Sequence, residues 1–417
     1  MHTMNRFIML RLAVLALVLF WDASAMGAVC GDGLCQRGES LTNCPVDCRQ
    51  LFSSSNKANL ILDRSIAPRG VRQPDGGVLL GVTRTISGRH VIQAVAGRQP
   101  LGTWEIRGDV EKSISPKKGD LGNPSPFVDK NGRVLMAFRD HASTESRMTY
   151  QLRVEYSDDN GLTWNRWGSG GDGVIDSSNH GLWEPFLYRD AHGDLRAVYA
   201  KERAPQSCNG KPVEKQDVVM RMSRDGGKSW GAEQVVASAG LSREGVPTVA
   251  RLRDGSYVLA FESWRNEACE TLNPKLVIRY MQSKDGVQWS NKSLLYSPTP
   301  LRESAESQLQ DYPVASWPYA LGLQDGRLLI LFTTNESHPD AGGKFPPGEK
   351  SYDIKYKLTK HEASYENVEW EETPAHIAYA MSAGDDEVRF ASAVELKGGA
   401  VAILFARPAR YIVLELR

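Results

Sequence analysis

The chain has 417 residues, and its 50 lysines and arginines balance its 50 aspartates and glutamates. This balance excludes the basic excess that favours nucleic-acid binding, and the ordinary apolar content is typical of a soluble globular protein. The length allows two or three domains, unless one large set of repeats takes up most of the chain.

The first 25 residues have the pattern of a cleaved secretory signal. Arg6 and Arg11 accompany an apolar run that ends near Trp21, and the small residues Ala23-Ser24-Ala25 follow it. We therefore predict a signal peptide at residues 1–25 and a protein that is secreted or periplasmic. This run is too short for a stable membrane span and no later stretch is long enough, so we expect no span.

Residues 26–50 form a short segment rich in cysteine. It is too small to bury a core, so we predict two disulfides formed in an oxidising compartment, and three pairings are possible. The four cysteines are Cys30, Cys35, Cys44 and Cys48.

Three acidic residues of this segment are candidate metal ligands. Asp32, Glu39 and Asp47 carry oxygens that suit a structural calcium ion, but the spacing of an EF-hand is absent, which favours solvated loop acids. Elsewhere His141, His180 and His338 show no ligand spacing. We expect no metal site in the rest of the chain and no other cofactor.

The remainder, residues 57–417, repeats a hairpin six times. Each copy has a tight turn followed by an apolar strand such as VLLGVTR or RVLMAFRD, which predicts antiparallel hairpins. Six copies predict an all-β, six-bladed propeller, in which each blade is a four-stranded sheet. The six turns are expected at Asp75-Gly76, Asn131-Gly132, His192-Gly193, Asp254-Gly255, Asp325-Gly326 and Lys397-Gly398.

The early apolar run NLILD, residues 59–63, belongs to none of these copies. Too few strands follow Arg407 to complete the last blade. We therefore predict that the N-terminal strand completes that blade and closes the ring, which removes open sheet edges.

A second motif recurs at the outer turns of the blades. Its fullest form is Ser223-x-Asp225-x-Gly227-x-Ser229-Trp230. The Asp side chain can accept backbone N–H groups within such a turn, while the glycine adopts a backbone conformation that other residues avoid. This octet resembles the Asp-box of the sialidase superfamily, and its role is structural. Further copies start at Ser157 and Ser283, and a remnant is Thr103-Trp104.

The candidate site lies at the mouth opposite the hairpin turns, where first strands begin and second strands end. The residues there combine carboxylates, guanidiniums and aromatic rings, which together suit an oligosaccharide or polysaccharide. The substrate-binding candidates are Arg84, Arg139, Asp140, His141, Trp183, Glu202, Glu244, Trp264, Tyr312, Trp317, Arg389 and Arg407.

Glu184 and Glu262 are the predicted catalytic pair. Each has apolar or aromatic neighbours, in WEPF and FESW, so partial burial can raise the pKa of one carboxyl while the other stays ionised. The sequence does not divide the two roles between them. Glu202 is expected to form a salt bridge or accept a substrate hydroxyl, and Glu244 is a third carboxylate.

Cys208 and Cys269 occupy matching loops of adjacent blades, six residues after Glu202 and seven after Glu262. In a secreted protein a disulfide between them is favoured over two free thiols. We predict that this bond ties the rim beside the proposed acids.

From about residue 57 onward the chain resembles the sialidase superfamily. GLWEPFL, VYAKE and REGVPTVARLRDGSYVLAFES are most similar to its exo-acting arabinanases and their bacterial relatives. The resemblance implies an exo-glycoside hydrolase, which we expect to be a monomer and to act on arabinan-type or other plant or microbial glycans. It also implies that Glu184 and Glu262 serve as nucleophile and general acid/base.

Two alternatives remain open. A true sialidase uses three arginines, an Asp and a Tyr–Glu pair, and its first arginine lies in a Tyr-Arg-Ile-Pro motif. The corresponding stretch here reads SIAPRGVRQPDGG, so only Arg69 or Arg72 is near, with Arg389 and Arg407 as further arginines. The second alternative is a non-catalytic carbohydrate-binding propeller, because Asp-boxes also occur in receptors that do not hydrolyse.

Overall fold

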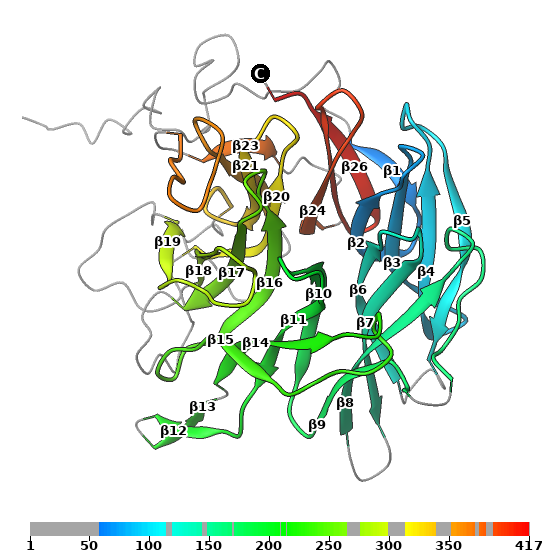
Figure 1. Cartoon of the computed structure of the whole chain (residues 1–417), viewed down its shortest axis with the longest axis horizontal. Coiled ribbons are helices and arrows are strands. Elements are labelled where there is room, and N and C mark those ends of the chain that lie inside the picture. Colours follow the sequence, from blue (N-terminus) through cyan, green and yellow to red (C-terminus); the bar gives the residue numbers. More distant parts are fainter. Residues whose placement is uncertain are drawn as a thin grey trace, which may run out of the picture.

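The computed structural model describes residues 58–113, 119–143, 148–168, 171–208, 210–213, 215–264, 276–298, 313–338, 352–371, 375–380 and 387–416. Within these ranges the secondary structure is β-strand without α-helix, and six four-stranded antiparallel sheets surround a central axis (Figure 1). The predicted all-β, six-bladed propeller is confirmed. The signal peptide, the segment at residues 26–50 with its four cysteines, Tyr312 and Cys269 lie outside the described residues.

The first five blades follow one another along the chain. Blade one contains β2 (Ser65–Arg72), β3 (Val78–Ile86), β4 (Arg89–Gly97) and β5 (Trp104–Lys112); blade two contains β6 (Gly119–Val128), β7 (Val134–Ser143), β8 (Met148–Ser157) and β9 (Val174–Ser178). Blade three contains β10 (Leu182–Arg189), β11 (Leu195–Glu202), β14 (Gln216–Ser223) and β15 (Gln234–Ala237). Blade four contains β16 (Glu244–Arg251), β17 (Tyr257–Trp264), β18 (Leu276–Ser283) and β19 (Ser293–Tyr296). Blade five contains β20 (Ala315–Gly322), β21 (Leu328–Thr334), β22 (Asp353–Leu358) and β23 (His376–Tyr379).

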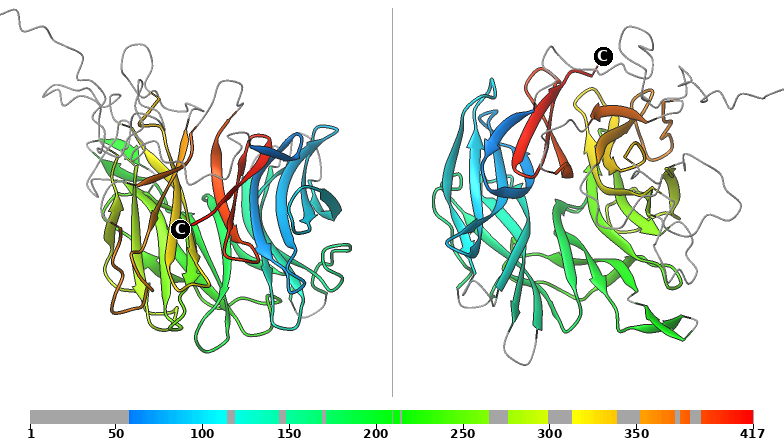
Figure 2. Two further views of the ribbon diagram at one scale, coloured as in Figure 1. Left: turned by 90° about the horizontal axis from the view of Figure 1, so that it is seen from above. Right: turned by 180° about the vertical axis from the view of Figure 1, so that it is seen from behind.

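Blade six combines strands from both ends of the described chain. It contains β24 (Arg389–Glu395), β25 (Val401–Ala406), β26 (Ala409–Leu414) and, as its outermost strand, β1 (Asn59–Leu62). β1 runs antiparallel to β26, with Asn59 opposite Tyr411. The early and late strands lie side by side in every view (Figure 2). A small hairpin, β12 (Gln206–Cys208) and β13 (Lys211–Val213), projects from blade three.

The hydrophobic core is a series of layers between neighbouring blades. On β3, Leu79 packs in a cluster with Met136 of blade two, whereas Leu80 packs in a cluster with Leu404 of blade six. Successive residues of a strand point to opposite faces, so one strand supplies both layers. Each fully buried leucine contributes about 1.5–3 kcal/mol, and blades without helices are held together chiefly by such layers.

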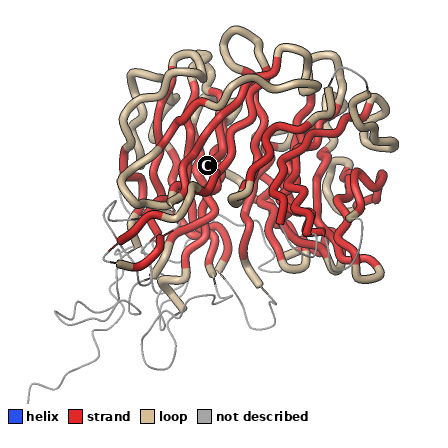
Figure 3. Tube along the Cα trace, turned by 90° about the horizontal axis from the view of Figure 1, so that it is seen from below, coloured by secondary structure: helices blue, strands red, loops and turns tan. Residues whose placement is uncertain are grey.

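Six hairpin turns join the first and second strands of the blades, at the rim where first strands end and second strands begin. Figure 3 shows the strands in red running between loops in tan at both ends. Each hairpin turn holds a glycine with a positive φ, such as Gly132 at 85°, whose N–H donates to the Asp129 carbonyl at 2.9 Å. Glycine adopts this conformation without steric cost. The sixth turn lies one residue later than we predicted, because Gly399 rather than Gly398 donates the equivalent bond, to Leu396.

The octet beginning at Ser223 forms a compact turn around one carboxylate. Asp225 accepts hydrogen bonds from the Ser229 N–H at 2.9 Å, from the Ser229 hydroxyl at 2.5 Å and from the Ser223 hydroxyl at 2.7 Å. Trp230 donates from its indole to the Gly227 carbonyl at 3.1 Å. Asp159 makes the equivalent bonds to Ser157 and Thr163. These aspartates therefore serve the turns and lie apart from the opposite mouth.

The innermost strands of all six blades carry the same irregularity, a β-bulge near their start. On β10 the register skips Glu184 and Pro185, and corresponding skips occur on β2, β6, β16, β20 and β24. In each bulge one non-glycine residue has a positive φ between 45° and 55°. A bulge re-aims a side chain, and proline is tolerated there because it needs no ladder partner. The six residues, here called the bulge ring, are Ala67, Asn123, Glu184, Val246, Trp317 and Phe390.

Candidate active site

One mouth of the central channel opens into a cavity of about 990 Å³. Its lining includes five members of the bulge ring, and only Val246 of the ring is absent from it. The cavity faces away from the hairpin turns, because the lining residues come from the starts of first strands and the ends of second strands. The bulges therefore aim their side chains into a single space at the mouth that the sequence predicts.

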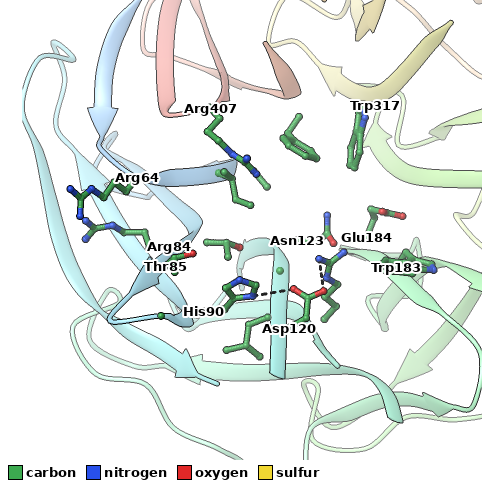
Figure 4. A pocket seen from close by; sticks show the side chains of 18 of the residues that line it. Arg64, Arg84, Thr85, His90, Asp120, Asn123, Trp183, Glu184, Trp317 and Arg407 are labelled. Atoms are coloured by element: carbon green, nitrogen blue, oxygen red, sulfur yellow. Dashed lines mark hydrogen bonds and ion pairs between the residues drawn. The ribbon is translucent and has the colours of Figure 1, made fainter. Parts of the chain in front are cut away.

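Glu184 lies in the wall of this cavity (Figure 4) and is 4% exposed. Burial, together with the neighbouring charge of Glu262, raises the pKa of Glu184 to about 7 against the opposing effects of Arg243, Arg139 and Arg69. The guanidinium of Arg69 is itself buried and donates to the Pro185 carbonyl at 3.0 Å. A carboxyl with this pKa keeps a proton near neutral pH.

Glu262 comes from the adjacent blade and is 2% exposed. It accepts a hydrogen bond from Arg243 Nη1 at 3.1 Å through Oε1, and one from the Trp317 backbone N–H at 3.1 Å through Oε2. Arg243 lines the cavity and is held by Gln216 at 2.9 Å. Glu262 is not itself among the residues that line the cavity, but its charge acts on Glu184, and the Arg243 guanidinium acts on both glutamates.

Trp183 forms an aromatic wall next to Glu184. Its indole N–H donates to Glu202 Oε1 at 2.8 Å, and Glu202 Oε2 accepts the Gly181 N–H at 3.0 Å. The Arg139 guanidinium lies 5.0 Å above the Trp183 ring. Both Glu202 oxygens therefore hold the wall in place, and a cation fixes the ring from one face.

Arg139 extends this arrangement toward blade one. It forms an ion pair with Asp120 at 2.8 Å, and Asp120 also lies 3.1 Å from His90. All three residues line the cavity. Since the three residues belong to β7, β6 and β4, this chain of contacts connects the first two blades along the cavity wall.

His141 does not line the cavity, although it supports Trp183. It is 3% exposed, its Nε2 lies 2.8 Å from the Leu182 carbonyl, and its ring meets that of Trp183 edge-on at 5.0 Å. Burial, together with the charge of Arg139, lowers the pKa of His141 to about 4. The neutral ring therefore donates to the Leu182 carbonyl and holds Trp183 in position.

Four further candidates lie outside the cavity lining. Asp140 pairs with Arg153 at 3.6 Å, because residues that follow one another on β7 point to opposite faces. Glu244 is 0% exposed and pairs with Lys292 at 3.2 Å, while Arg389 pairs with Glu387 at 3.0 Å. Trp264 packs with Cys208 and Val213. These side chains stabilise the blades, whereas the candidates that line the cavity are Arg84, Arg139, Trp183, Glu184, Glu202, Trp317 and Arg407.

Cys208 is buried and is not a free thiol. Its predicted partner Cys269 lies outside the described residues, so the pairing stays a prediction. In the described part of the chain no group of three or more metal-binding side chains is positioned around a common point. Nor does this part contain a helix with the length and hydropathy of a membrane span.

Several lining residues were missed by the sequence analysis, among them Arg64, His90, Asp120 and Asn123. A signal for the bulge ring was nevertheless present. Five of its members precede a proline, and each of these prolines lies seven residues before the first residue of a hairpin turn, as Pro185 does before His192. A proline at this fixed distance before a hairpin turn therefore marks the bulge, and the residue before the proline is the one with the positive φ. The sixth copy, Phe390-Ala391, lacks the proline.

No protein-family model matches this sequence, and no curated protein matches it either. Solved structures do share its fold. The GH93 α-L-arabinofuranosidase of Fusarium graminearum, solved with arabinobiose, is 15% identical, with 86% of this chain and 97% of that one covered and a TM-score of 0.56.

Two further solved structures are similar over most of the chain. An α-L-arabinanase of Penicillium chrysogenum, also in complex with arabinobiose, is 17% identical, with coverage of 88% and 97% and a TM-score of 0.55. The NanB sialidase of Streptococcus pneumoniae is 12% identical, with coverage of 88% and 70% and a TM-score of 0.54. At identities this low the likeness shows the fold alone, a six-bladed β-propeller.

Proposed function

We propose that this propeller is a glycoside hydrolase and that Glu184 and Glu262 are its catalytic residues. The observation that carries the proposal is a pair of buried carboxyls from adjacent blades: Glu184 lines the cavity and has a pKa raised to about 7, and Glu262 lies close enough for its charge to contribute to that rise. Glycosidases use such a pair, a protonated acid and an ionised carboxylate. The solved arabinofuranosidase, arabinanase and sialidase that share this fold support the same class of reaction.

In this proposal Glu184 is the general acid. Its proton passes to the glycosidic oxygen as the bond between that oxygen and the anomeric carbon breaks. Glu262 is the anionic partner, since both of its oxygens accept N–H groups, one of them from a guanidinium. Glu262 then either attacks the anomeric carbon or takes a proton from an attacking water, and NMR of the first product anomer distinguishes these two routes.

The test compares Glu184→Gln and Glu262→Gln with the unmodified protein on a panel of glycosides. The panel contains a chromogenic α-L-arabinofuranoside, arabinan oligosaccharides and a fluorogenic sialoside. We expect Glu262→Gln to lower kcat/KM by about 10²-fold to 10⁴-fold on every substrate that is hydrolysed, and Glu184→Gln to do so on substrates with a natural glycosidic linkage. Glu362→Gln, at an exposed site on the opposite rim, is the control and should leave the rate unchanged. Hydrolysis that continues at the full rate in both variants contradicts the proposal and favours a binding propeller.

A substrate with a good leaving group separates the two roles. Departure of dinitrophenolate needs little help from an acid, so Glu184→Gln should lose much less activity on a dinitrophenyl glycoside than on a natural linkage. Glu262→Gln should lose activity on both. If the pattern is reversed, the assignment of the two residues is reversed as well.

The pH dependence follows from the raised pKa of Glu184. A general acid must be protonated in the free enzyme, so kcat/KM should fall as the pH rises through about 7. The measurement is a profile of kcat/KM from pH 5 to pH 9. An activity that instead rises across neutral pH means that Glu184 does not act as the acid.

The substrate favoured within this proposal is a terminal sugar of an arabinan-type or other plant or microbial glycan. The proposal also includes export of the protein by its N-terminal signal. The neighbours solved with arabinobiose support this choice. A sialoside is the second candidate, because five arginines line the cavity. Against it, the stretch that corresponds to the sialidase arginine motif carries Ile66 in the cavity wall. The sialoside in the panel decides between them.

A further inference from the structure

The central channel contains a second cavity, at the end opposite the mouth where Glu184 lies. Its volume is about 340 Å³, and it opens at the rim of the hairpin turns, since Asp129 and Lys130 of the second turn line it. Between the two cavities the channel narrows to a space of about 10 Å³, roughly what one water molecule needs. No described residue lines both cavities. The second space, here called the turn-side cavity, is therefore separate from the candidate active site.

The walls of the turn-side cavity are largely apolar. Phe127 and Phe186 line it and are only half-buried. The Phe186 ring meets that of Tyr319 edge-on, with the centroids 6.1 Å apart and an angle of 74° between the planes. A further aromatic ring packs well in such an arrangement, and covering apolar surface is favourable. The other apolar side chains of the wall are Val71, Pro126, Val128, Leu187 and Val249.

Arg69 lies at the inner, closed end of the turn-side cavity. Its side chain is buried, with the residue 8% exposed, and Nη1 donates to the Pro185 carbonyl at 3.0 Å. Among the described residues no carboxylate lies within ion-pair distance of this guanidinium, and Glu184 acts on it only from farther away. A buried cation is costly without a paired anion, and a guanidinium has five N–H donors to offer one. The inner end therefore suits a carboxylate.

The Tyr319 hydroxyl is a second donor for the inner end. Tyr319 is 7% exposed, lines the turn-side cavity, and interacts electrostatically with Arg69. Burial raises the pKa of Tyr319 to about 12, so the hydroxyl keeps its proton and can donate a hydrogen bond. Arg69 and Tyr319 thus place a cation and a neutral donor next to each other.

The outer lip of the turn-side cavity is positively charged. Asp129 supplies the one carboxylate among the described lining residues, and it pairs with Arg189 at 2.6 Å. Lys130 and Arg251 lie exposed at the same lip. Positive charge around an opening raises the local concentration of anions and speeds their entry. The lip and the inner end therefore favour the same sign of charge in a ligand.

We propose that the turn-side cavity is a second ligand site that binds a small aromatic carboxylate, with the carboxylate on Arg69 and Tyr319 and the ring against Phe186. A planar guanidinium matches the two oxygens of a carboxylate. The volume is at the lower end for small-molecule sites, which suits one ring with a short side chain. This inference goes beyond the proposed hydrolase function and does not depend on it.

The test is calorimetric titration of the full chain with 3-phenylpropionate, 3-phenylpropan-1-ol and propionate. The alcohol lacks the charge of 3-phenylpropionate, and propionate lacks its ring. We expect 3-phenylpropionate to bind about tenfold or more tightly than either, because a hydrogen bond to a charged group and the burial of a ring each have at least this effect. If 3-phenylpropionate binds no more tightly than the alcohol, or no more tightly than propionate, the inference is wrong.

Substitutions assign the binding to the turn-side cavity. Arg69→Gln should lower the affinity for 3-phenylpropionate to that for the alcohol, and Tyr319→Phe should lower it by about fivefold. Phe186→Leu should weaken both aromatic probes and leave propionate unchanged. Arg84→Gln, which removes a guanidinium from the cavity at Glu184, is the matched control and should change none of the three affinities.

Thermal unfolding of each variant identifies a folding defect, and if Arg69→Gln does not fold, Tyr319→Phe and Phe186→Leu decide the question. Binding of 3-phenylpropionate that is lost in Arg84→Gln, or that is unchanged in every turn-side variant that folds, overturns the inference even if glycosides are hydrolysed. Binding that weakens as expected in the turn-side variants and persists in Arg84→Gln supports it, even if no glycoside in the panel is cleaved and the hydrolase proposal fails.

Discussion

A single carboxyl illustrates how this fold produces a reactive group. Glu184 has a φ of 45°, which places a non-glycine residue in the left-handed region, and the bulge that imposes this φ also buries the side chain. Burial disfavours the ionised form, so the pKa rises to about 7. The backbone irregularity and the raised pKa of Glu184 are therefore two consequences of one local structure.

The raised pKa of Glu184 makes the stability of the protein depend on pH. The folded state holds this proton more tightly than the unfolded state, where the ordinary value is 4.5. The contribution of Glu184 to the free energy of unfolding is thus complete below about pH 4.5 and is lost as the pH rises through about 7. Glu184→Gln removes the dependence, so this variant should exceed the original protein in stability by about 3 kcal/mol at pH 9 and match it at pH 4.5.

Urea unfolding of both proteins at several pH values measures this difference. Glu362→Gln is the control, because its exposed carboxyl should not alter the pH dependence. If the stability difference between Glu184→Gln and the original protein is the same at pH 4.5 and at pH 9, the carboxyl of Glu184 does not carry a raised pKa.

At the scale of the element, blades two, three and four each contain two kinds of specialised backbone on opposite rims. The outer turns are held by side chains such as Asp225, and the inner strands begin with bulges such as Glu184-Pro185. The turn fixes where one strand ends and the next begins, while the bulge directs one side chain toward the axis. Within these sheets the turns that stabilise the fold thus lie at one rim, and the bulges that direct side chains toward the axis lie at the other.

Removing the carboxylate of one outer turn should destabilise the fold without changing the site. Asp225→Ala leaves two hydroxyls and one backbone N–H without their acceptor, and we expect a loss of about 1–2 kcal/mol in the free energy of unfolding. Asp158→Ala is the control, since its exposed ion pair with Arg133 is worth less than about 1 kcal/mol. Urea unfolding measures both, and an equal loss in the two variants would mean that the turn gains nothing from Asp225.

At the scale of the whole molecule, the ring depends on a seam between residues that are far apart in the sequence. β1 lies against β26, and the 7% exposed Ile61 packs in one cluster with Val78 of blade one and Tyr411 of blade six. Because β1 leads directly into β2 of blade one, its pairing with β26 ties the first blade to the last and closes the ring. Blades one and six both supply residues to the wall of the cavity, so the seam also contributes to its shape.

Two neighbouring residues of β1 test the seam. Ile61→Ala should lower the free energy of unfolding by about 2–5 kcal/mol, because it removes a buried side chain that joins the ends of the chain. Leu60→Ala, at a side chain that is 51% exposed, should cost well under about 1 kcal/mol. Thermal and urea unfolding provide the comparison, and similar effects of the two substitutions would show that β1 does not pack as described.

Much of the fold could be predicted from the sequence because its determinants are local. Six glycine turns with apolar strands behind them specify hairpins, and hairpins of constant length repeated six times specify a ring of blades. Glu184 and Glu262 could be selected as a pair for a similar reason, since each is a charge with apolar neighbours, one near the start of a first strand and the other near the end of a second strand. The one-residue error at the sixth turn arose where Gly398 and Gly399 adjoin and both accept a positive φ.

What the sequence by itself determined is therefore the repeat, the blade and the rim on which the polar residues gather. Only the tertiary structure decided which of those residues face the cavity, because facing depends on strand register and on neighbouring blades. Asp140 and Glu244 form ion pairs with Arg153 and Lys292. Asp120 and His90, in contrast, line the cavity although no distinctive motif in the sequence surrounds them. The pKa of Glu184 likewise depends on Arg243 and Glu262, residues of another blade that approach it only when the ring is assembled.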